Sequence, residues 1–202
     1  MRRWILVSAL CSAVLAPRAE AAVPDPTTSS VGPCLVVCPS GDYHFWVTVR
    51  DVFANPVAGS TVTIDLTSCP GVALCPGRPE DPYLINGRVV LGITNAQGVV
   101  DFPIRAGGVC SAAVPIRADG VHLAQRPVAS YDQDGNLLVE NIDDMIAGLK
   151  VGTADPTADF DCDGTVTQVD RDVIFDVHGA HRCDMPVPVR PSTWGRLKAS
   201  YR

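Results

Sequence analysis

The sequence predicts a mainly β protein, in which a β-sandwich is followed by a small helical domain. Three observations lead to this expectation. Short runs rich in Val, Ile and Thr recur between residues 31 and 128 and are separated by turn residues. Two helical periods occur close to the C-terminal end of the chain. Each of them follows directly on a copy of one acidic pattern of twelve residues.

Residues 1–21 have the composition of an export signal peptide. Arg2 and Arg3 provide a positive start, the run from Trp4 to Ala16 is apolar, and Ala19-Glu20-Ala21 supplies the small residues of a cleavage site. The apolar run is too short for a stable anchor, and no other stretch is apolar over enough residues to cross a bilayer. We therefore expect a protein that is secreted or displayed at the cell surface, without a transmembrane segment. A core helix is the alternative interpretation of this run.

Residues 31–128 are predicted to form the sandwich. The run Val62-Thr-Ile64-Asp-Leu66 alternates apolar and polar residues, which places Val62, Ile64 and Leu66 on one face of a strand. No long helical period interrupts the region, and several short strands in about a hundred residues are typical of two packed sheets. The predicted strands are Tyr43–Val49, Ser60–Leu66, Arg88–Thr94, Val99–Ile104 and Cys110–Ala118.

The turns of this region resemble those of bacterial Ig-like domains. Asp51 leads through Asn55-Pro56-Val57-Ala58-Gly59 into the strand at Ser60, and Thr94-Asn95-Ala96-Gln97-Gly98 precedes another strand. Both turns are similar to signatures of the Ig-like domains of adhesins (Big-1) and of carboxypeptidase-regulatory type. The resemblance implies an Ig-like β-sandwich at a cell surface and no particular activity.

The repeated pattern has the spacing of an EF-hand calcium loop. One copy runs from Asp132 to Asp143 and the other from Asp159 to Asp170. Both have Asp at positions 1, 3 and 12, Asp or Asn at position 5, Val at position 8 and a β-branched residue at position 11. The predicted ligands of two calcium ions are Asp132, Asp134, Asn136, Leu138, Glu140 and Asp143 in the first loop, and Asp159, Asp161, Asp163, Thr165, Thr167 and Asp170 in the second. The alternative is a pair of acidic turns that bind nothing.

The two loops differ at position 6, where an EF-hand loop turns sharply on Gly. Gly164 occupies this position in the second loop, whereas Leu137 occupies it in the first. Because a β-carbon disfavours the turn, we expect the second loop to be the stronger site. Whether the first loop binds calcium stays open. A shifted register would place Gly135 at position 6, but it loses the acidic residues at positions 1 and 12.

A helix is predicted after each loop, over Asp143–Lys150 and Asp170–His178. Each has apolar residues at helical spacing, and we expect the two apolar faces to pack on each other. These apolar residues are Ile142, Met145, Ile146 and Leu149 in one copy, and Val173, Ile174 and Val177 in the other.

Residues 129–184 resemble dockerin domains, which also carry two calcium loops that end in Asp and are each followed by one helix. The resemblance implies a non-catalytic module that attaches to a cohesin-like or other surface protein. It further implies that positions 10 and 11 of each loop face the partner, which are Asn141, Ile142, Gln168 and Val169 here. The alternative is that Ile142 and Val169 are core residues.

Seven cysteines follow the signal peptide, and an exported chain can keep disulfides. We expect Cys162 to pair with Cys183, because both lie in the acidic region, and Cys69 to pair with Cys75 across a short loop. Cys110 could then pair with Cys34 or Cys38, which stays open. A zinc site is the alternative use of these residues, but the sequence contains no CxxC pair.

The charge distribution excludes one class of partner. The chain has a formal net charge of −6, and residues 130–184 hold thirteen Asp or Glu against three Lys or Arg. Nucleic-acid binding needs clustered basic residues, so we expect no nucleic-acid partner. Residues 185–202 form a Pro-rich spacer and basic tail, which is either frayed or a short contact helix.

The leading hypothesis is an exported, non-catalytic calcium-binding protein, in which the dockerin-like module attaches the Ig-like domain to a protein partner. A second hypothesis keeps the calcium but drops the partner, so that calcium only rigidifies a surface adhesin or spacer. An enzyme is a third hypothesis. Its best support is the pair His178 and His181, but Gly179 breaks the helix that would align them and no Glu lies between them.

Overall fold

The computed structural model describes residues 22–41, 43–177 and 183. This part of the chain is mainly β, which confirms the predicted class: it contains eleven strands and two helices. The elements are β1 (Ser30–Val31), β2 (Leu35–Val37), β3 (Phe45–Thr48), β4 (Thr61–Asp65), β5 (Ala73–Leu74), β6 (Tyr83–Asn86), β7 (Val89–Ile93), β8 (Val99–Phe102), β9 (Ala106–Gly107), β10 (Cys110–Ala118), β11 (Val121–Ser130), α1 (Asn141–Leu149) and α2 (Gln168–Val177). The predicted signal peptide and the tail at 185–202 lie outside the described residues.

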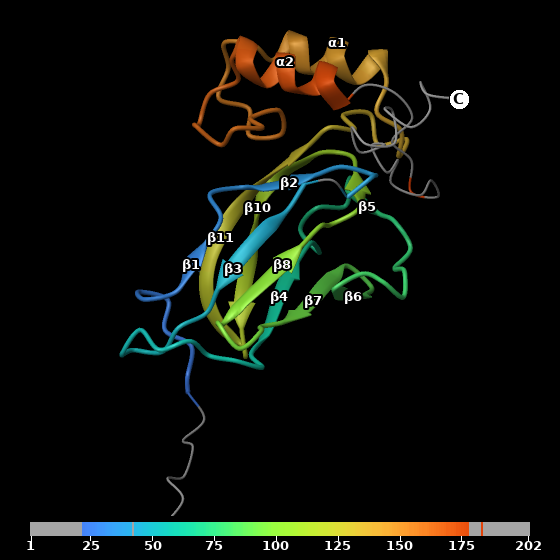
Figure 1. Ribbon diagram of the computed structural model, residues 1–202. Helices are drawn as coiled ribbons and strands as arrows, with labels where there is room; N and C mark the ends of the chain where they lie inside the picture. The colour runs from blue at the N-terminus through green and yellow to red at the C-terminus, as the bar shows by residue number, and fades with distance from the viewer. Residues whose placement is uncertain (1–21, 42, 178–182, 184–202) are drawn as a thin grey trace, which may run out of the picture.

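Two sheets face each other, and the helices lie at one end of them (Figure 1). The larger sheet has the strand order β2-β11-β10-β4-β7-β6, and the smaller has the order β1-β3-β8. All neighbouring strands in these sheets run antiparallel except β2 and β11, which are parallel. A third pair, β5 with β9, lies near the helical end.

One apolar core lies between the two sheets. Phe45 and Phe102 of the smaller sheet belong to the same buried cluster as Ile116 of the larger one. The face predicted from alternation is confirmed, because Val62, Ile64 and Leu66 have no solvent exposure. Burying such side chains on both inner faces is the main force that holds two sheets together.

The predicted strands were found, with their ends shortened by one or two residues in most cases, and Cys110–Ala118 was found with the predicted bounds. The longest strand, β11, was not predicted. It contains Pro127, and its residues alternate poorly between buried and half-exposed over most of its length. β11 ends at Ser130 and leads directly into the first acidic loop, so it carries that loop at the end of the larger sheet.

The helices begin two residues before their predicted starts, and α2 buries its apolar face as expected at Ile174 and Val177. The expectation for α1 was wrong, because Met145 and Leu149 are 54% and 79% exposed. The inward face of α1 carries Asp143 and Ala147 instead, which are one helical turn apart. Asp143 accepts hydrogen bonds from the loop before it, and this requirement sets the rotation of the helix.

A second buried cluster joins the helices to the end of the larger sheet. Its aromatic centre is Tyr131, which stacks between Tyr43 and Phe160 with ring centroids 4.4 and 4.3 Å away. Ala129, at the end of β11, and Ile174, in α2, belong to the same cluster. The loops and helices therefore rest on the β region through a continuous apolar contact. Within the described residues, neither helix has the length and apolarity needed to span a membrane.

Candidate metal centre

The two acidic loops have the same backbone conformation at two special positions. At position 4 the left-handed region is occupied by Gly135 (φ 80°) and Cys162 (φ 64°), and at position 6 by Leu137 (φ 63°) and Gly164 (φ 95°). The match supports the register in which Leu137 stands at position 6. Each loop therefore has one Gly and one residue with a β-carbon at the two positions that favour Gly.

The carboxylate at position 12 organises both loops in the same way. One oxygen of this Asp accepts hydrogen bonds from the backbone N–H groups of positions 2 and 3, and the other oxygen accepts one from position 9. The distances are 2.6, 3.2 and 2.8 Å from Gln133, Asp134 and Glu140 to Asp143, and 2.7, 3.2 and 2.8 Å from Phe160, Asp161 and Thr167 to Asp170. Each loop is thus closed onto the first turn of its helix.

The carboxylate at position 1 holds the sharp turn. The backbone N–H of Leu137 donates to Asp132 Oδ2 at 2.7 Å, and that of Gly164 donates to Asp159 Oδ2 at 2.9 Å. These bonds stabilise the left-handed residue at position 6 in both loops. They also explain how Leu137 is tolerated there in the first loop.

Three carboxylates converge in each loop. Ligand atoms of Asp132, Asp134 and Asp143 lie within 4.8 Å of one another, as do those of Asp159, Asp161 and Asp170. In both clusters positions 1 and 12 are buried and position 3 is exposed. Asp163 and Glu140, the other acidic members of the predicted ligand sets, lie outside these clusters. The side chains of Asn136 and Asp163 accept the backbone N–H of Leu138 and of Thr165 at 2.8 Å, and Thr167 Oγ1 donates to Asp170 at 3.2 Å.

Burial opposes the negative charge of these groups. It raises the pKa of Asp132 to about 6, with the nearby Asp143 contributing in the same direction. Burial also raises the pKa of Asp143. It raises the pKa of Asp161 as well, where repulsion from Asp170, Asp163 and Asp159 acts in the same direction. Converging carboxylates of this kind are stabilised by a cation. All the side-chain donors are hard oxygens, which fits calcium better than zinc or copper.

A polar network links the two loops. Lys150, which follows α1, donates to Gln133 Oε1 at 2.7 Å and to Thr157 Oγ1 at 2.6 Å, and it lies 3.3 Å from Asp155 Oδ2. Gln133 is position 2 of the first loop, and Thr157 lies two residues before position 1 of the second. The network therefore fixes the starts of both loops relative to each other.

The first loop also packs on a pair of glycines that sequence analysis did not identify. The backbone N–H of Gly108 donates to the carbonyl of Asp132 at 2.8 Å. A β-carbon built on Gly107 would lie 1.9 Å from Asp132 Oδ2. Only a residue without a side chain lets β9 approach this carboxylate so closely. The sequence shows two consecutive glycines beside a turn, but nothing in it indicates that they contact Asp132.

The disulfide predictions were wrong. The bonds among the described residues are Cys34–Cys162, Cys69–Cys110 and Cys75–Cys183, in place of Cys162–Cys183 and Cys69–Cys75. The predictions relied on nearness in sequence, whereas a disulfide needs Cα atoms about 4.4–6.8 Å apart with suitable side-chain directions. The fold meets this condition between distant segments, with Cα–Cα distances of 5.7, 5.0 and 5.3 Å. Cys38 is buried outside these bonds, and Ser40 Oγ donates to its sulfur at 3.2 Å.

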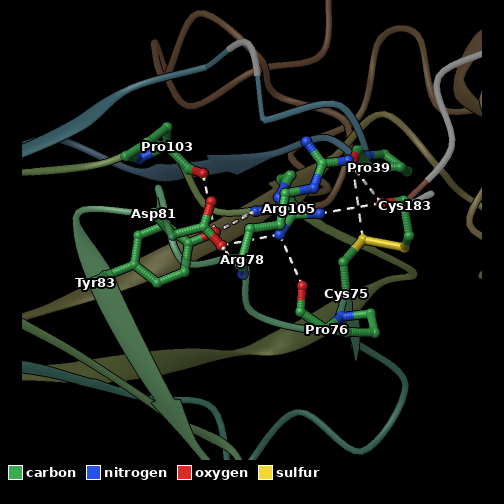
Figure 2. Close-up of polar contacts among 9 residues, drawn as sticks. All are labelled: Pro39, Cys75, Pro76, Arg78, Asp81, Tyr83, Pro103, Arg105 and Cys183. Atoms are coloured by element: carbon green, nitrogen blue, oxygen red, sulfur yellow. Dashed lines mark hydrogen bonds and ion pairs between the residues drawn. A yellow bond between two sulfur atoms is a disulfide. The ribbon is translucent and has the colours of Figure 1, made fainter. Parts of the chain in front are cut away.

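Two arginines of the β region hold the cysteine at the end of the helical part (Figure 2). Arg78 Nη2 and Arg105 Nη1 both donate to the carbonyl of Cys183 at 3.0 Å. Arg105 is itself fixed by Asp81, 2.9 Å away, in an ion pair with side chains 4% and 9% exposed. A hollow of about 700 Å³ lies between these arginines and residues 136–138 of the first loop.

The predicted partner-facing residues are at the surface. Asn141 and Gln168 are exposed, Val169 is 57% exposed, and Ile142 is half-buried. The alternative interpretation of Val169 as a core residue is therefore wrong. The histidines of the enzyme hypothesis, His178 and His181, lie outside the described residues.

Comparison with known proteins found no relative. No protein-family model, no curated protein and no solved structure gave a significant match to this chain.

Proposed function

We propose that the protein is an exported, non-catalytic calcium-binding protein, in which an Ig-like sandwich carries a dockerin-like pair of calcium loops. The observation that carries the proposal is the hydrogen-bond frame shared by the two loops. Asp143 and Asp170 each accept hydrogen bonds from the backbone N–H groups of loop positions 2, 3 and 9. Asp132 and Asp159 each accept one from the backbone N–H of position 6. Two unrelated acidic turns have no reason to agree at this level of detail.

Calcium would compensate the charge that each loop concentrates. In the first loop Asp132, Asp134 and Asp143 would supply carboxylate oxygens, and in the second Asp159, Asp161 and Asp170 would do so. The exposed carboxylate at position 3 leaves each cluster accessible to an ion from solvent. Because a bound cation relieves repulsion among the carboxylates, binding should couple to the stability of the loops.

Exposed apolar residues of the helices support a role in attachment. Met145 and Leu149 on α1 and Val169 on α2 are each more than half exposed. An exposed apolar surface on a helix is a common feature of protein interfaces. We therefore propose that these helices bind a cohesin-like or other surface protein.

A second function is favoured by a different observation. The Cys34–Cys162 and Cys75–Cys183 bonds and the stack of Tyr131 on Phe160 fix the loops to the β region. This arrangement suits a calcium-rigidified adhesin or spacer with no partner for the helices. The two functions share the calcium sites and differ only at the surface of α1 and α2.

Thermal denaturation of the mature chain, residues 22–202, tests the calcium proposal. Calcium should raise the unfolding temperature, and magnesium at equal concentration should raise it less, because the loops offer several oxygens in a flexible frame. Asp134→Ala and Asp161→Ala should each reduce the effect by removing one site. Glu80→Ala, an exposed residue of the β region, is the control. An unfolding temperature that is unchanged by calcium would overturn the proposal.

Binding to purified cohesin-like domains separates the attachment function from the spacer function. Met145→Asp and Val169→Asp should weaken attachment and leave calcium binding intact, because both side chains are exposed. Val52→Asp, at a similarly exposed position far from the helices in sequence, is the matched control. Equal binding by all variants would contradict the proposed surface.

A further inference from the structure

One cysteine lies within the second calcium loop. Cys162 stands at position 4, between Asp161 and Asp163, and has a left-handed backbone with φ 64°. The first loop has Gly135 at this position, with φ 80°. The conformation costs little for Gly but is disfavoured for a residue with a β-carbon. The second loop therefore needs something that holds Cys162 in place.

The Cys34–Cys162 bond supplies this restraint. Cys34 is buried and directly precedes β2, which pairs with the end of β11 in the larger sheet. Its sulfur also lies 3.9 Å from the carbonyl oxygen of Asp159, at position 1 of the loop. The bond thus connects position 4 of the loop to a rigid strand of the sheet, across 128 residues of sequence.

We propose that the Cys34–Cys162 bond controls the calcium affinity of the second loop, so that the site is redox-sensitive. The inference rests on the proposed function, because it concerns the same calcium site. A dithiol reductant would attack the bond through a thiolate. The sulfur–sulfur bond breaks, Cys34 and Cys162 each gain one electron and one proton, and the dithiol leaves as a cyclic disulfide.

Reduction should act on the second loop more than on the first. Once the bond is reduced, the backbone of Cys162 can leave the left-handed region. Calcium binding must then restore that conformation, which costs part of the binding free energy. We expect calcium affinity at this loop to fall on the order of tenfold, which corresponds to about 1.4 kcal/mol. By linkage, bound calcium should oppose reduction of the bond by the same factor.

The structure provides a control bond. Cys162 is half-exposed, so a reductant can approach the bond from the loop side, whereas Cys69 and Cys110 are buried in the β core. Among the described residues, neither Cys69 nor Cys110 forms a hydrogen bond with either loop. Removing it should lower stability without a selective effect on calcium.

The experiment measures calcium affinity by calorimetry on the full mature chain carrying Asp134→Ala, which leaves the second loop as the only intact site. Cys34→Ser/Cys162→Ser is compared with Cys69→Ser/Cys110→Ser. A third variant, Cys34→Ser/Cys162→Gly, lacks the bond but has a residue suited to position 4. We expect about tenfold weaker binding for the first variant, no selective loss for the second, and recovery of most of the affinity for the third.

A second measurement needs no variant. The oxidised wild-type chain is treated with a dithiol, with and without calcium, and each thiol is alkylated and quantified by mass spectrometry. Calcium should slow the appearance of the Cys162 thiol and leave that of Cys69 unchanged. Equal affinities for all three bond variants, or reduction of Cys162 that does not respond to calcium, would overturn the inference. Oxidised wild-type protein that binds no calcium at all would instead overturn the proposed function.

Discussion

Tyr131 and Phe160 stack with their ring centroids 4.3 Å apart and their planes inclined by 12°. Tyr131 directly follows β11 and precedes the first ligand position of the first loop, whereas Phe160 is position 2 of the second loop. One aromatic contact therefore joins the larger sheet to both candidate calcium sites.

Phe160→Ala should destabilise the whole chain by about 3 kcal/mol, since Phe160 is only 7% exposed and its loss leaves a cavity against Tyr131. Calcium affinity should fall at both loops, because both depend on this contact. Chemical denaturation and calcium titration measure the two effects. Phe53→Ala, at an 81% exposed residue, should change stability by less than about 0.5 kcal/mol. A loss of stability without any loss of calcium affinity would contradict the link.

Leu137→Gly should strengthen the first loop. Leu137 holds φ 63°, a conformation that costs a residue with a β-carbon about 1 kcal/mol relative to Gly. The substitution should raise the calcium affinity of the first loop several-fold, as measured by calorimetry in an Asp161→Ala background. Leu138→Gly is the matched control: it is the neighbouring half-buried leucine without a positive φ, and it should bring no gain. Equal effects of the two substitutions would exclude backbone strain as the cause.

Gly107→Ala should damage the first loop selectively. The added β-carbon would lie 1.9 Å from Asp132 Oδ2, so either β9 or the carboxylate must move. We expect calcium affinity at the first loop to fall at least tenfold and that of the second to change little. Gly77→Ala, where a β-carbon meets nothing within 4 Å, should have no effect. Unchanged binding by the Gly107 variant would show that β9 does not position Asp132.

The stability of the calcium-free chain should rise as the pH falls from 7.5 to 5. Burial raises the pKa of Asp132 to about 6 from its ordinary value of 3.8, and it also raises the pKa of Asp143. The folded chain therefore binds protons more tightly than the unfolded chain between about pH 6 and pH 4, and protonation favours folding in that window. The unfolding temperature after removal of calcium measures this effect. A value that falls steadily over the same range would contradict it.

Calcium affinity, in contrast, should fall as the pH falls. Calcium binds the ionised carboxylates and must displace a proton from Asp132 below about pH 6. Titrations in two buffers of different ionisation enthalpy should reveal proton release at pH 5.5 and little release at pH 7.5. Asp65, whose pKa is lowered by its hydrogen bond from Thr67, titrates at more acidic pH and does not interfere.

Local patterns were predictable from the sequence, and long-range contacts were not. The alternation of Val62, Ile64 and Leu66 indicated the buried face of β4, and the twelve-residue repeat indicated both loops with the correct register, because each pattern is contained in a few neighbouring residues. The disulfides could not be predicted in this way. Cys34 and Cys162 meet only because β2 pairs with the end of β11, which is a property of the complete fold.

The orientation of α1 shows a second limit. Its apolar residues predicted a buried face, yet Leu149 is 79% exposed. Asp143 must point inward to close the loop, and residues on the same face as Asp143 follow it inside. In α2 the apolar residues lie on the same face as Asp170, so the buried face predicted from their spacing was correct there. Hydrogen bonds to the carboxylate of Asp143, rather than hydrophobic periodicity, thus determine the rotation of α1.

Titration calorimetry of the oxidised mature chain with calcium counts the ions that the two loops bind. We expect two bound ions per chain, one for each set of converging carboxylates, with Asp134→Ala and Asp161→Ala each removing one. One ion in the wild-type chain, lost on Asp161→Ala and kept on Asp134→Ala, would restrict the claim to the second loop. No heat of binding, together with an unchanged circular dichroism spectrum after addition of calcium, would contradict calcium binding by these loops.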